Sequence, residues 1–302
     1  MSSETYRCVV CGFKQYSYVF SALRQVYRTA DLKDRKNFIY IRCDSCGFIS
    51  QRDVLPDAEL AECYEEDSYV VKNSQLLEYV MSVYYDIARH LERTRDNRLL
   101  DIGAGDGGYL AYARRCGWQV WGCDISRYAR EIALNKRKIK VVSMEEAEAL
   151  PDKYFDRITL YNVLEHINDP SRIFSLIRRK LKAGGICVIM IPVADSLEQT
   201  IFKGQSAWVS APYHLGLYSE KNMQMLAGNN NFKIKKVCND WYTPSMFSFS
   251  FFEILQRRLG FFMPLQQKKI AAILLLPLIW PMLIISAIFG KSALKSFYLT
   301  HE

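Results

Sequence analysis

The sequence predicts an α/β fold in which a mostly parallel, Rossmann-like sheet is covered by helices on both faces. Two short apolar runs end in Asp101 and Asp124, as is typical of buried parallel strands. Three glycines at alternate positions follow the first run, and a stretch of helical periodicity comes next. Strand and helix patterns then continue to alternate. This alternation predicts the doubly covered sheet, and the glycines place a ligand site at the carboxyl ends of its strands.

The loop after the first strand has the composition of a site for a nucleoside-type cofactor. Gly103, Gly105 and Gly107 let the backbone turn sharply and approach a ligand with no Cβ in the way. The N-terminus of the next helix then faces the bound molecule. Asp124 ends the second strand, where a carboxylate can accept both hydroxyls of a ribose. No Gly-Lys-Ser/Thr sequence follows the glycines, which argues against a P-loop.

These residues resemble the class I S-adenosylmethionine (SAM)-dependent methyltransferases, whose first motif is an acidic residue followed by G-x-G-x-G. Three further segments match that family in order: the adenine-side segment over 146–151, the fourth strand and its loop over 154–166, and the turn into the fifth strand over 182–192. The resemblance implies an enzyme with a Rossmann-like fold that transfers a methyl group from SAM. The cofactor-binding residues that it implies are Asp101, Gly103, Gly105, Gly107, Asp124, Ile125, Glu146, Ala147 and Asn162.

The N-terminal segment predicts a structural zinc site. Cys8 and Cys11 form one C-x-x-C pair, and Cys43 and Cys46 form a second. Four thiolates suit tetrahedral Zn(II), and a stretch with strand character between the pairs favours a zinc ribbon. All four metal positions would be filled, so we expect a structural role for the ion. The alternative is a set of four unrelated buried thiols.

The zinc ribbon and the residues after it resemble the heads of many bacterial methyltransferases of sugar and polysaccharide pathways. Those heads continue with Cys-Gly, a Pro-x-x-x-Glu-Leu stretch and an aromatic acidic segment, and residues 46–47, 56–60 and 63–69 fit that layout. The resemblance implies a saccharide acceptor, small or lipid-linked, in cell-envelope polysaccharide or glycolipid synthesis. We expect the remaining cysteines to behave as small buried hydrophobes: Cys63, Cys116, Cys123, Cys187 and Cys238.

Three side chains near the expected acceptor pocket are candidates for catalysis. Glu165 and His166 directly follow the fourth strand. In related quinone O-methyltransferases the matching positions can hold a divalent metal, whereas in many other relatives they only cap a helix and shape the pocket. His214 lies in a loop with one Trp and two Tyr, which suits stacking on a sugar or an aromatic ring. His214 is the favoured general base because the ordinary pKa of imidazole lies near the working pH. A purely structural role is its alternative.

The stretch from Ile270 to Phe289 contains no charged residue over twenty positions. As a straight helix it would be long enough to cross a bilayer. Pro277 and Pro281 would each break a helical hydrogen bond, and basic residues flank both ends. We therefore expect a re-entrant or in-plane helical hairpin rather than a single span. A buried core helix or a dimer interface is the alternative.

The excess positive charge is concentrated near the C-terminus. The net charge is +8, and six basic residues but no acidic one lie between Ile254 and His301. The rest of the chain therefore has a net charge of only +2, which argues against a nucleic-acid-binding face. We expect residues 246–263 and the apolar stretch to associate with an anionic membrane surface. No signal peptide is visible, so the expected location is the cytoplasmic face of the inner (plasma) membrane.

Three parts are expected along the chain: a zinc-ribbon module over residues 1–70, a methyltransferase core over 71–245 and a membrane-associating segment over 246–302. The core is expected to begin with a lead-in helix, because apolar residues recur with a helical period over residues 74–95. Two other functions remain open. One is methylation of a membrane-dissolved small molecule such as a quinone or a lipid. The other is a non-catalytic scaffold that recruits partners through its zinc ribbon.

Overall fold

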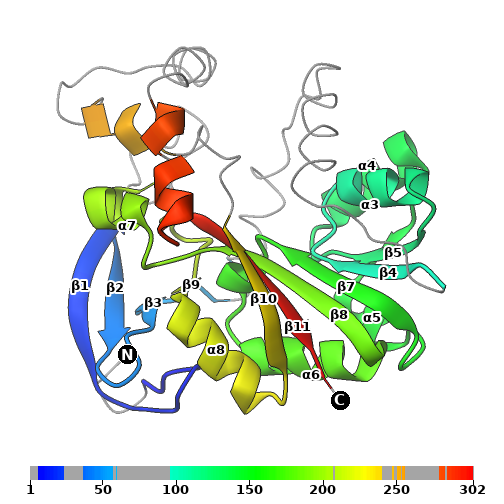
Figure 1. Cartoon of the computed structure of the whole chain (residues 1–302), viewed down its shortest axis with the longest axis horizontal. Helices are drawn as coiled ribbons and strands as arrows, with labels where there is room; N and C mark the ends of the chain where they lie inside the picture. Colours follow the sequence, from blue (N-terminus) through cyan, green and yellow to red (C-terminus); the bar gives the residue numbers. More distant parts are fainter. Residues whose placement is uncertain are drawn as a thin grey trace.

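Figure 1 shows the chain as a computed structural model. The residues that the structure describes are 6–23, 37–56, 59, 96–206, 208–239, 247, 250–252, 254–255, 279–282 and 284–301. The expected lead-in helix over 74–95, the aromatic acidic segment over 63–69 and residues 270–278 of the apolar stretch lie outside these ranges.

The core is a seven-stranded sheet in the order β10-β11-β8-β7-β4-β5-β6. The pairs β6–β5, β5–β4, β4–β7 and β7–β8 are parallel, whereas β11 is antiparallel to both β8 and β10. The predicted Rossmann-like, mostly parallel sheet is therefore confirmed. Its strands are β4 (Arg98–Ile102), β5 (Gln119–Cys123), β6 (Val141–Val142), β7 (Phe155–Tyr161), β8 (Leu181–Pro192), β10 (Lys233–Asn239) and β11 (Leu294–Thr300).

Helices cover both faces of this sheet, with α3 and α4 on one face and α5 and α6 on the other (Figure 1). Polar residues start several of them: the Ser126 side chain caps α4, and Asp169 caps α6 directly before a proline at the first helical position. The helices are α3 (Gly108–Arg115), α4 (Arg127–Arg137), α5 (Met144–Glu148), α6 (Pro170–Lys180), α7 (Leu197–Phe202) and α8 (Glu220–Asn229), with single turns of 3₁₀ helix at η2 (Leu164–His166) and η3 (Lys203–Gln205).

The strand β11 lies within residues 246–302, the range expected to be a membrane-associating segment. It fills the place between β8 and β10, so the core sheet is not confined to residues 71–245. Residues 240–293 are therefore an insertion between two neighbouring strands of the sheet rather than a tail after it. The sequence pattern concealed this strand because only four residues separate it from a longer apolar run.

A second, four-stranded sheet has the order β1-β2-β3-β9, with antiparallel pairing throughout. Its last strand, β9 (Gly216–Leu217), comes from the core, so the N-terminal module and the core share one sheet. Side-chain hydrogen bonds join the same two parts: Tyr40 Oη donates to the His214 carbonyl at 2.8 Å, and Asn222 Nδ2 donates to the Cys46 carbonyl at 2.9 Å. The other strands are β1 (Tyr16–Leu23), β2 (Asn37–Cys43) and β3 (Ile49–Gln51).

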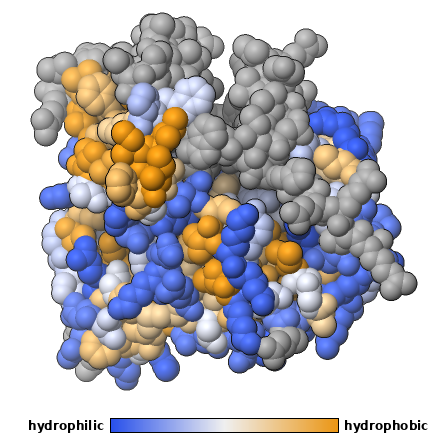
Figure 2. Space-filling model, viewed as in Figure 1, coloured by the Kyte–Doolittle hydropathy of each residue, from blue (hydrophilic) through white to orange (hydrophobic). Residues whose placement is uncertain are grey.

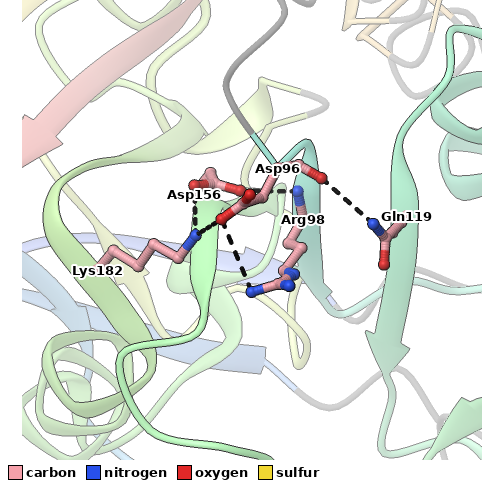
Figure 3. A network of polar contacts seen from close by, with 5 residues as sticks. All are labelled: Asp96, Arg98, Gln119, Asp156 and Lys182. Atoms are coloured by element: carbon pink, nitrogen blue, oxygen red, sulfur yellow. Dashed lines mark hydrogen bonds and ion pairs between the residues drawn. The ribbon is translucent and has the colours of Figure 1, made fainter.

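The edge of the core sheet where β4 and β7 begin is held by a polar network (Figure 3). Lys182 Nζ donates to Asp156 Oδ1 at 2.9 Å and also to Asp96. Asp156 Oδ2 accepts the backbone N–H of Arg98 at 2.9 Å. The ion pairs are partly solvated and each contributes about 0–1 kcal/mol. The network joins the starts of three neighbouring strands at the edge opposite the glycine loop, so we assign it a structural role.

Residues 279–282 and 284–288 of the apolar stretch are helical and lie beside α7 (Figure 1). None of the described helices is both long enough and apolar enough to span a bilayer. Five large apolar side chains are exposed among the described residues of 280–289, from 40% at Ile284 to 75% at Ile288 and Phe289, with Trp280 at 43% and Ile285 at 54%. In Figure 2 apolar side chains gather over this part of the surface.

Candidate functional site

The glycine loop after β4 has a backbone that only glycine adopts without strain. Gly103, Gly105 and Gly107 have φ angles of +73°, +56° and +74°, all in the left-handed region. A Cβ on Gly103 would also lie 2.3 Å from the Val163 side chain. Alanine is therefore excluded at Gly103 twice, by the backbone angle and by the neighbouring strand end. The helix α3 begins directly after this loop, as the sequence predicts.

Two buried carboxylates support the loop. Asp124, at the end of β5, accepts the N–H of Gly105 at 2.7 Å and the N–H of Ser126 at 2.9 Å. Asp101 accepts the Thr159 hydroxyl at 2.6 Å and so joins β4 to β7 beneath the loop. A carboxylate oxygen accepts two hydrogen bonds, so bracing the loop and binding a ribose are compatible roles for Asp124.

The remaining predicted cofactor residues lie at the same edge of the sheet. Asn162 follows β7, is exposed and has a left-handed φ of +55°. Ile125 follows Asp124 and is 63% exposed. Glu146 Oε2 accepts the backbone N–H of Ser143 at 2.8 Å in a capping box, and Ala147 is buried. Because the carboxyl ends of parallel strands meet at one edge, the structure brings these groups together around the glycine loop. Their contacts with SAM stay a prediction.

The four cysteines of the two C-x-x-C pairs come together in the N-terminal module. The Sγ atoms of Cys8 and Cys46 are 3.6 Å apart, and those of Cys11 and Cys43 are 3.5 Å apart. All four sulfur atoms lie within 4.8 Å of one another. A tetrahedral zinc ion with bonds of about 2.3 Å requires sulfur atoms about 3.8 Å apart. The donor set and its spacing therefore fit Zn(II). Among the other cysteines, Cys123 and Cys187 are buried as predicted, whereas Cys116 and Cys238 are only partly buried.

The three candidate catalytic side chains form one cluster beside the glycine loop. The turn η2 carries Glu165 and His166 at the end of β7, and the loop before β9 carries His214. The two imidazole rings are 4.7 Å apart and nearly perpendicular, at 86°. Glu165 completes the group, with one ligand atom of each residue within 4.8 Å of the others. The sequence predicted three separate candidates, and the structure makes them neighbours.

Backbone carbonyls fix the tautomer of both histidines. His166 Nδ1 lies 2.9 Å from the Tyr213 carbonyl, and His214 Nδ1 lies 2.7 Å from the Trp208 carbonyl. A carbonyl oxygen only accepts, so each Nδ1 carries the proton and each Nε2 is the acceptor of its ring. Burial, with the neighbouring His214 as a smaller cause, lowers the pKa of His166 to about 3. Burial lowers the pKa of His214 to about 4. Both rings are neutral near pH 7.

Glu165 is fully buried, and neither of its carboxyl oxygens has a hydrogen-bond partner among the described residues. Burial raises the pKa of Glu165 to about 8. An unpaired buried carboxyl group is costly, so its position beside two imidazole acceptors needs a compensating ligand or a proton. Two neutral imidazoles and one carboxylate are a donor set that suits a divalent transition metal, and a neutral imidazole also suits proton removal.

The aromatic loop differs from its prediction as an acceptor-stacking surface. Trp208, Tyr213 and Tyr218 are each less than a tenth exposed. Trp208 Nε1 donates to Glu198 Oε2 at 3.1 Å, and the Tyr218 ring packs 4.7 Å from Phe48 of the N-terminal module. These rings therefore face other parts of the protein. The partner of Trp208 lies ten residues away and that of Tyr218 lies in the N-terminal module, so tertiary contacts rather than a local pattern decide these orientations.

Glu198 is a buried acid that sequence reasoning missed. Besides Trp208, it accepts the hydroxyls of Ser206 at 3.1 Å and Ser250 at 2.6 Å. Burial raises the pKa of Glu198 above its ordinary value, and these three hydrogen bonds oppose that shift. The group ties the insertion, through Ser250, to the loop that carries His214. A lone Glu in a helix gives no sequence signal for such a contact.

Comparison with known proteins identifies the family to which this arrangement belongs. The chain matches the family described as a methyltransferase domain over residues 78–237, more than half of its length. A ubiquinone biosynthesis O-methyltransferase of Alkalilimnicola ehrlichii is 34% identical over 108 residues, which are 33% of this chain and 43% of that protein. A ubiquinone/menaquinone biosynthesis C-methyltransferase of Cupriavidus taiwanensis is 32% identical over 103 residues, 31% of this chain and 42% of that protein.

The chain thus spans less than half the length of these curated relatives. Among solved structures, a geranyl diphosphate methyltransferase in complex with GPP and sinefungin aligns with a TM-score of 0.51 and 14% identity. The alignment covers 75% of this chain and 80% of that one. The similarity between these two structures concerns the fold alone.

Proposed function

This chain belongs to the methyltransferase-domain family, and from that premise we propose that it is a SAM-dependent methyltransferase whose acceptor is a saccharide delivered on or with membrane lipid. The reaction would serve cell-envelope polysaccharide or glycolipid synthesis at the cytoplasmic face of the inner membrane. SAM supplies a methyl group on a sulfonium, so the protein has to align the acceptor and remove its proton.

We assign the cofactor to the edge formed by the ends of β4, β5 and β7. The glycine loop fits such a ligand because its left-handed backbone leaves no side chain between the loop and the bound molecule. Asp124 supplies the carboxylate for the ribose hydroxyls. The other residues assigned to the cofactor are Asp101, Ile125, Glu146, Ala147 and Asn162.

The observation that carries a lipid-borne acceptor is the position of the insertion between β10 and β11. Leu294 pairs with Pro192 at the carboxyl end of β8, and the Val193 N–H donates to the Ala293 carbonyl at 2.9 Å. The insertion therefore returns to the sheet at the same edge as the glycine loop. A surface that meets the described stretch directly before β11 would therefore lie on the cofactor side of the sheet.

The chemistry of the insertion favours an anionic membrane as that surface. Ile284, Ile285, Ile288 and Phe289 form an exposed apolar surface, which we call the isoleucine patch. No acidic residue lies between 254 and 301, and Lys291 is exposed beside the patch. Exposed apolar side chains next to basic ones are typical of helices that lie in a membrane interface.

For proton removal we propose His214, with His166 and Glu165 as its neighbours. The Nδ1 of His214 is already committed to the Trp208 carbonyl, so its Nε2 is the atom that accepts a proton. The low pKa keeps the ring neutral and available at neutral pH, although it also makes the ring a weak base. The neighbouring Glu165, once ionised, would offset the positive charge that develops on the ring.

We also propose that Cys8, Cys11, Cys43 and Cys46 hold one structural Zn(II). Their sulfur spacing supports this assignment. The ion would join the turn before β1 to the turn after β2, and β2 carries the Tyr40 hydroxyl that contacts the His214 backbone. The metal would thereby support the candidate base from a distance.

Mass spectrometry of envelope glycans and lipids from cells with and without the gene tests the acceptor. We expect a saccharide species to lose the mass of one methylene group in the cells without the gene. Loss of that mass from a quinone or another lipid alone would overturn the saccharide assignment. Unchanged spectra in every fraction would overturn the proposed function.

A second candidate is methylation of a membrane-dissolved quinone-type molecule. The cluster of Glu165, His166 and His214 favours it, because these donors suit a divalent metal. The two ubiquinone-pathway relatives described above point in the same direction. Methyl transfer that stops after chelation, returns with added divalent metal and is lost in Glu165→Gln would support this reading. Transfer that persists in a chelator would exclude a metal-dependent mechanism.

A further inference from the structure

A cavity of about 210 Å³ lies between the N-terminal module and the core. The module contributes Tyr6, Arg7, Tyr16 and Phe48 to its walls, and the core contributes two short segments. An apolar cavity of about 150 Å³ is enough to hold benzene, so this one has room for a six-membered ring. It is separate from the glycine loop, and none of the residues assigned to SAM lines it.

The core walls of the cavity are chain neighbours of the candidate catalytic residues. Ile167 and Asn168 follow His166, and Leu215 and Gly216 follow His214. The two segments are joined, because the Leu215 N–H donates to the Glu165 carbonyl at 2.7 Å. Leu215 is also joined to the N-terminal module, because the Gln51 N–H donates to the Leu215 carbonyl at 2.9 Å. A molecule in the cavity would therefore touch the backbone that positions both histidines.

The charge of the cavity favours an anion. Its two charged lining residues are Arg7 and Arg52, and no acidic residue lines it. Arg52 is paired with Asp53 at 2.7 Å. Arg7 is exposed and has no ion-pair partner among the described residues. Its guanidinium lies beside Gly12 of the cysteine turn, with Nε and Nη2 each 3.5 Å from the place of a Cβ on that glycine, so its charge is not neutralised by a carboxylate there. Guanidinium groups bind phosphate and carboxylate through two parallel hydrogen bonds.

The uncharged lining suits a hydroxylated ring. Tyr6, Tyr16 and Phe48 present aromatic surface, which packs against the apolar faces of a sugar ring. Ser50 and Asn168 add a hydroxyl and an amide, which pair with ring hydroxyls. A fully oxidised quinone offers carbonyl acceptors but no hydroxyl donors and no anion, so it matches this lining less well.

We propose that this cavity is an acceptor subsite that binds a pyranose ring carrying a phosphate group, with Arg7 as the phosphate-binding residue. This inference rests on the proposed function and names the part of the acceptor that is held away from the methylated atom. Binding energy from such a remote part aligns the reacting group with the cofactor. The phosphate also agrees with a lipid-linked acceptor, in which a sugar is joined to lipid through phosphate.

Calorimetric titration of the full chain with glucose 1-phosphate tests the subsite, with glucose, inorganic phosphate and 4-hydroxybenzoate as separate arms. We expect glucose 1-phosphate to bind more tightly than either glucose or phosphate. Arg7→Gln should weaken that binding by about tenfold or more, since it removes a charge-assisted contact. Asn168→Ala tests the opposite wall and lies away from the cysteine turn. Arg115→Gln, an exposed arginine at the end of α3, is the matched control and should bind as the unaltered chain does.

SAM affinity, measured on every variant, shows whether the fold is intact. Equal binding by Arg7→Gln and the unaltered chain, with SAM affinity unchanged in both, would overturn the subsite. Preferential binding of 4-hydroxybenzoate would overturn the saccharide occupant. If glucose 1-phosphate binds in an Arg7-dependent way but cells contain no methylated glycan, the subsite would remain supported and the proposed function would be overturned. A methylated glycan in cells, together with no binding of glucose 1-phosphate by the protein, would support the proposed function and overturn the subsite.

Discussion

At the scale of single residues, Asp124 holds the shape of the glycine loop, and we propose that it also binds the ribose of the cofactor. Its two oxygens hold the N–H groups of Gly105 and Ser126, and the carboxylate is 4% exposed. Removing it would leave a buried backbone donor without its partner as well as a ribose without its acceptor. On the proposed ribose assignment, the residue is therefore needed both for the loop and for the ligand.

Asp124→Ala should weaken SAM binding by about 10- to 100-fold, because it removes a charged hydrogen-bond acceptor. Asp124→Asn retains one oxygen that can accept a hydrogen bond from the loop, so its loss of SAM affinity should be smaller. Isothermal titration with SAM measures both, and circular dichroism checks the fold. An unchanged affinity in Asp124→Ala would mean that the ribose assignment is wrong.

His214 should matter for turnover more than for cofactor binding. His214→Ala should lower kcat by about 100-fold or more, the usual contribution of a general base, with little change in SAM affinity. His301→Gln is the control, since His301 is buried equally, at 8%, but contacts Leu181 at the start of β8, far from the glycine loop. Equal activity in both variants would assign His214 a structural role.

At the scale of elements, the short strand β9 makes the N-terminal module part of the site. It pairs with β3 through Ile49 and Leu217, and it directly follows the loop that carries His214. Shifting β3 would therefore shift the candidate base. The sequence predicts the ribbon and the core as separate parts, since a two-residue strand gives no periodic signal.

Removing the metal should consequently reduce turnover as well as stability. Cys46→Ser should lose its zinc, lower the unfolding midpoint by about 10 °C and slow methyl transfer. Cys116→Ser, which alters a cysteine outside the cluster, should retain one zinc per chain. Elemental analysis and thermal unfolding measure these effects. Full zinc content in Cys46→Ser would contradict the four-cysteine site.

At the scale of the whole molecule, the insertion between β10 and β11 sets how membrane association has to be tested. A truncation that removes residues 254–302 would also remove β11, and with it the central neighbour of both β8 and β10. Such a chain would fail for reasons unrelated to lipid. Substitutions on the exposed isoleucine patch avoid this problem.

Ile285→Glu combined with Ile288→Glu should abolish binding to vesicles of anionic phospholipid, because charge replaces the apolar surface that would enter the interface. Leu134→Glu, at a 52% exposed leucine on α4, is the matched control and should float with vesicles as the unaltered chain does. Flotation of the double variant at the unaltered level would refute the patch as the membrane contact.

Much of this arrangement follows from local sequence signals, and the remainder depends on distant contacts. The apolar runs before Asp101 and Asp124 predicted the central strands, because buried parallel strands have that pattern. The positive φ values at Gly103, Gly105 and Gly107 agree with the reason for expecting glycine there. Glu165 meeting His214 and Glu198 holding Ser250 could not be predicted, since each contact joins segments with no common period or motif.

The proposed activity is tested most directly by transfer of an isotopically labelled methyl group from SAM by the purified full chain, with anionic vesicles that carry extracted envelope lipids. We expect label in the lipid-linked saccharide fraction, and less of it when Ile285 and Ile288 of the isoleucine patch are replaced by glutamates. Label confined to the quinone fraction, or none in any fraction while SAM is bound, would contradict the proposed activity.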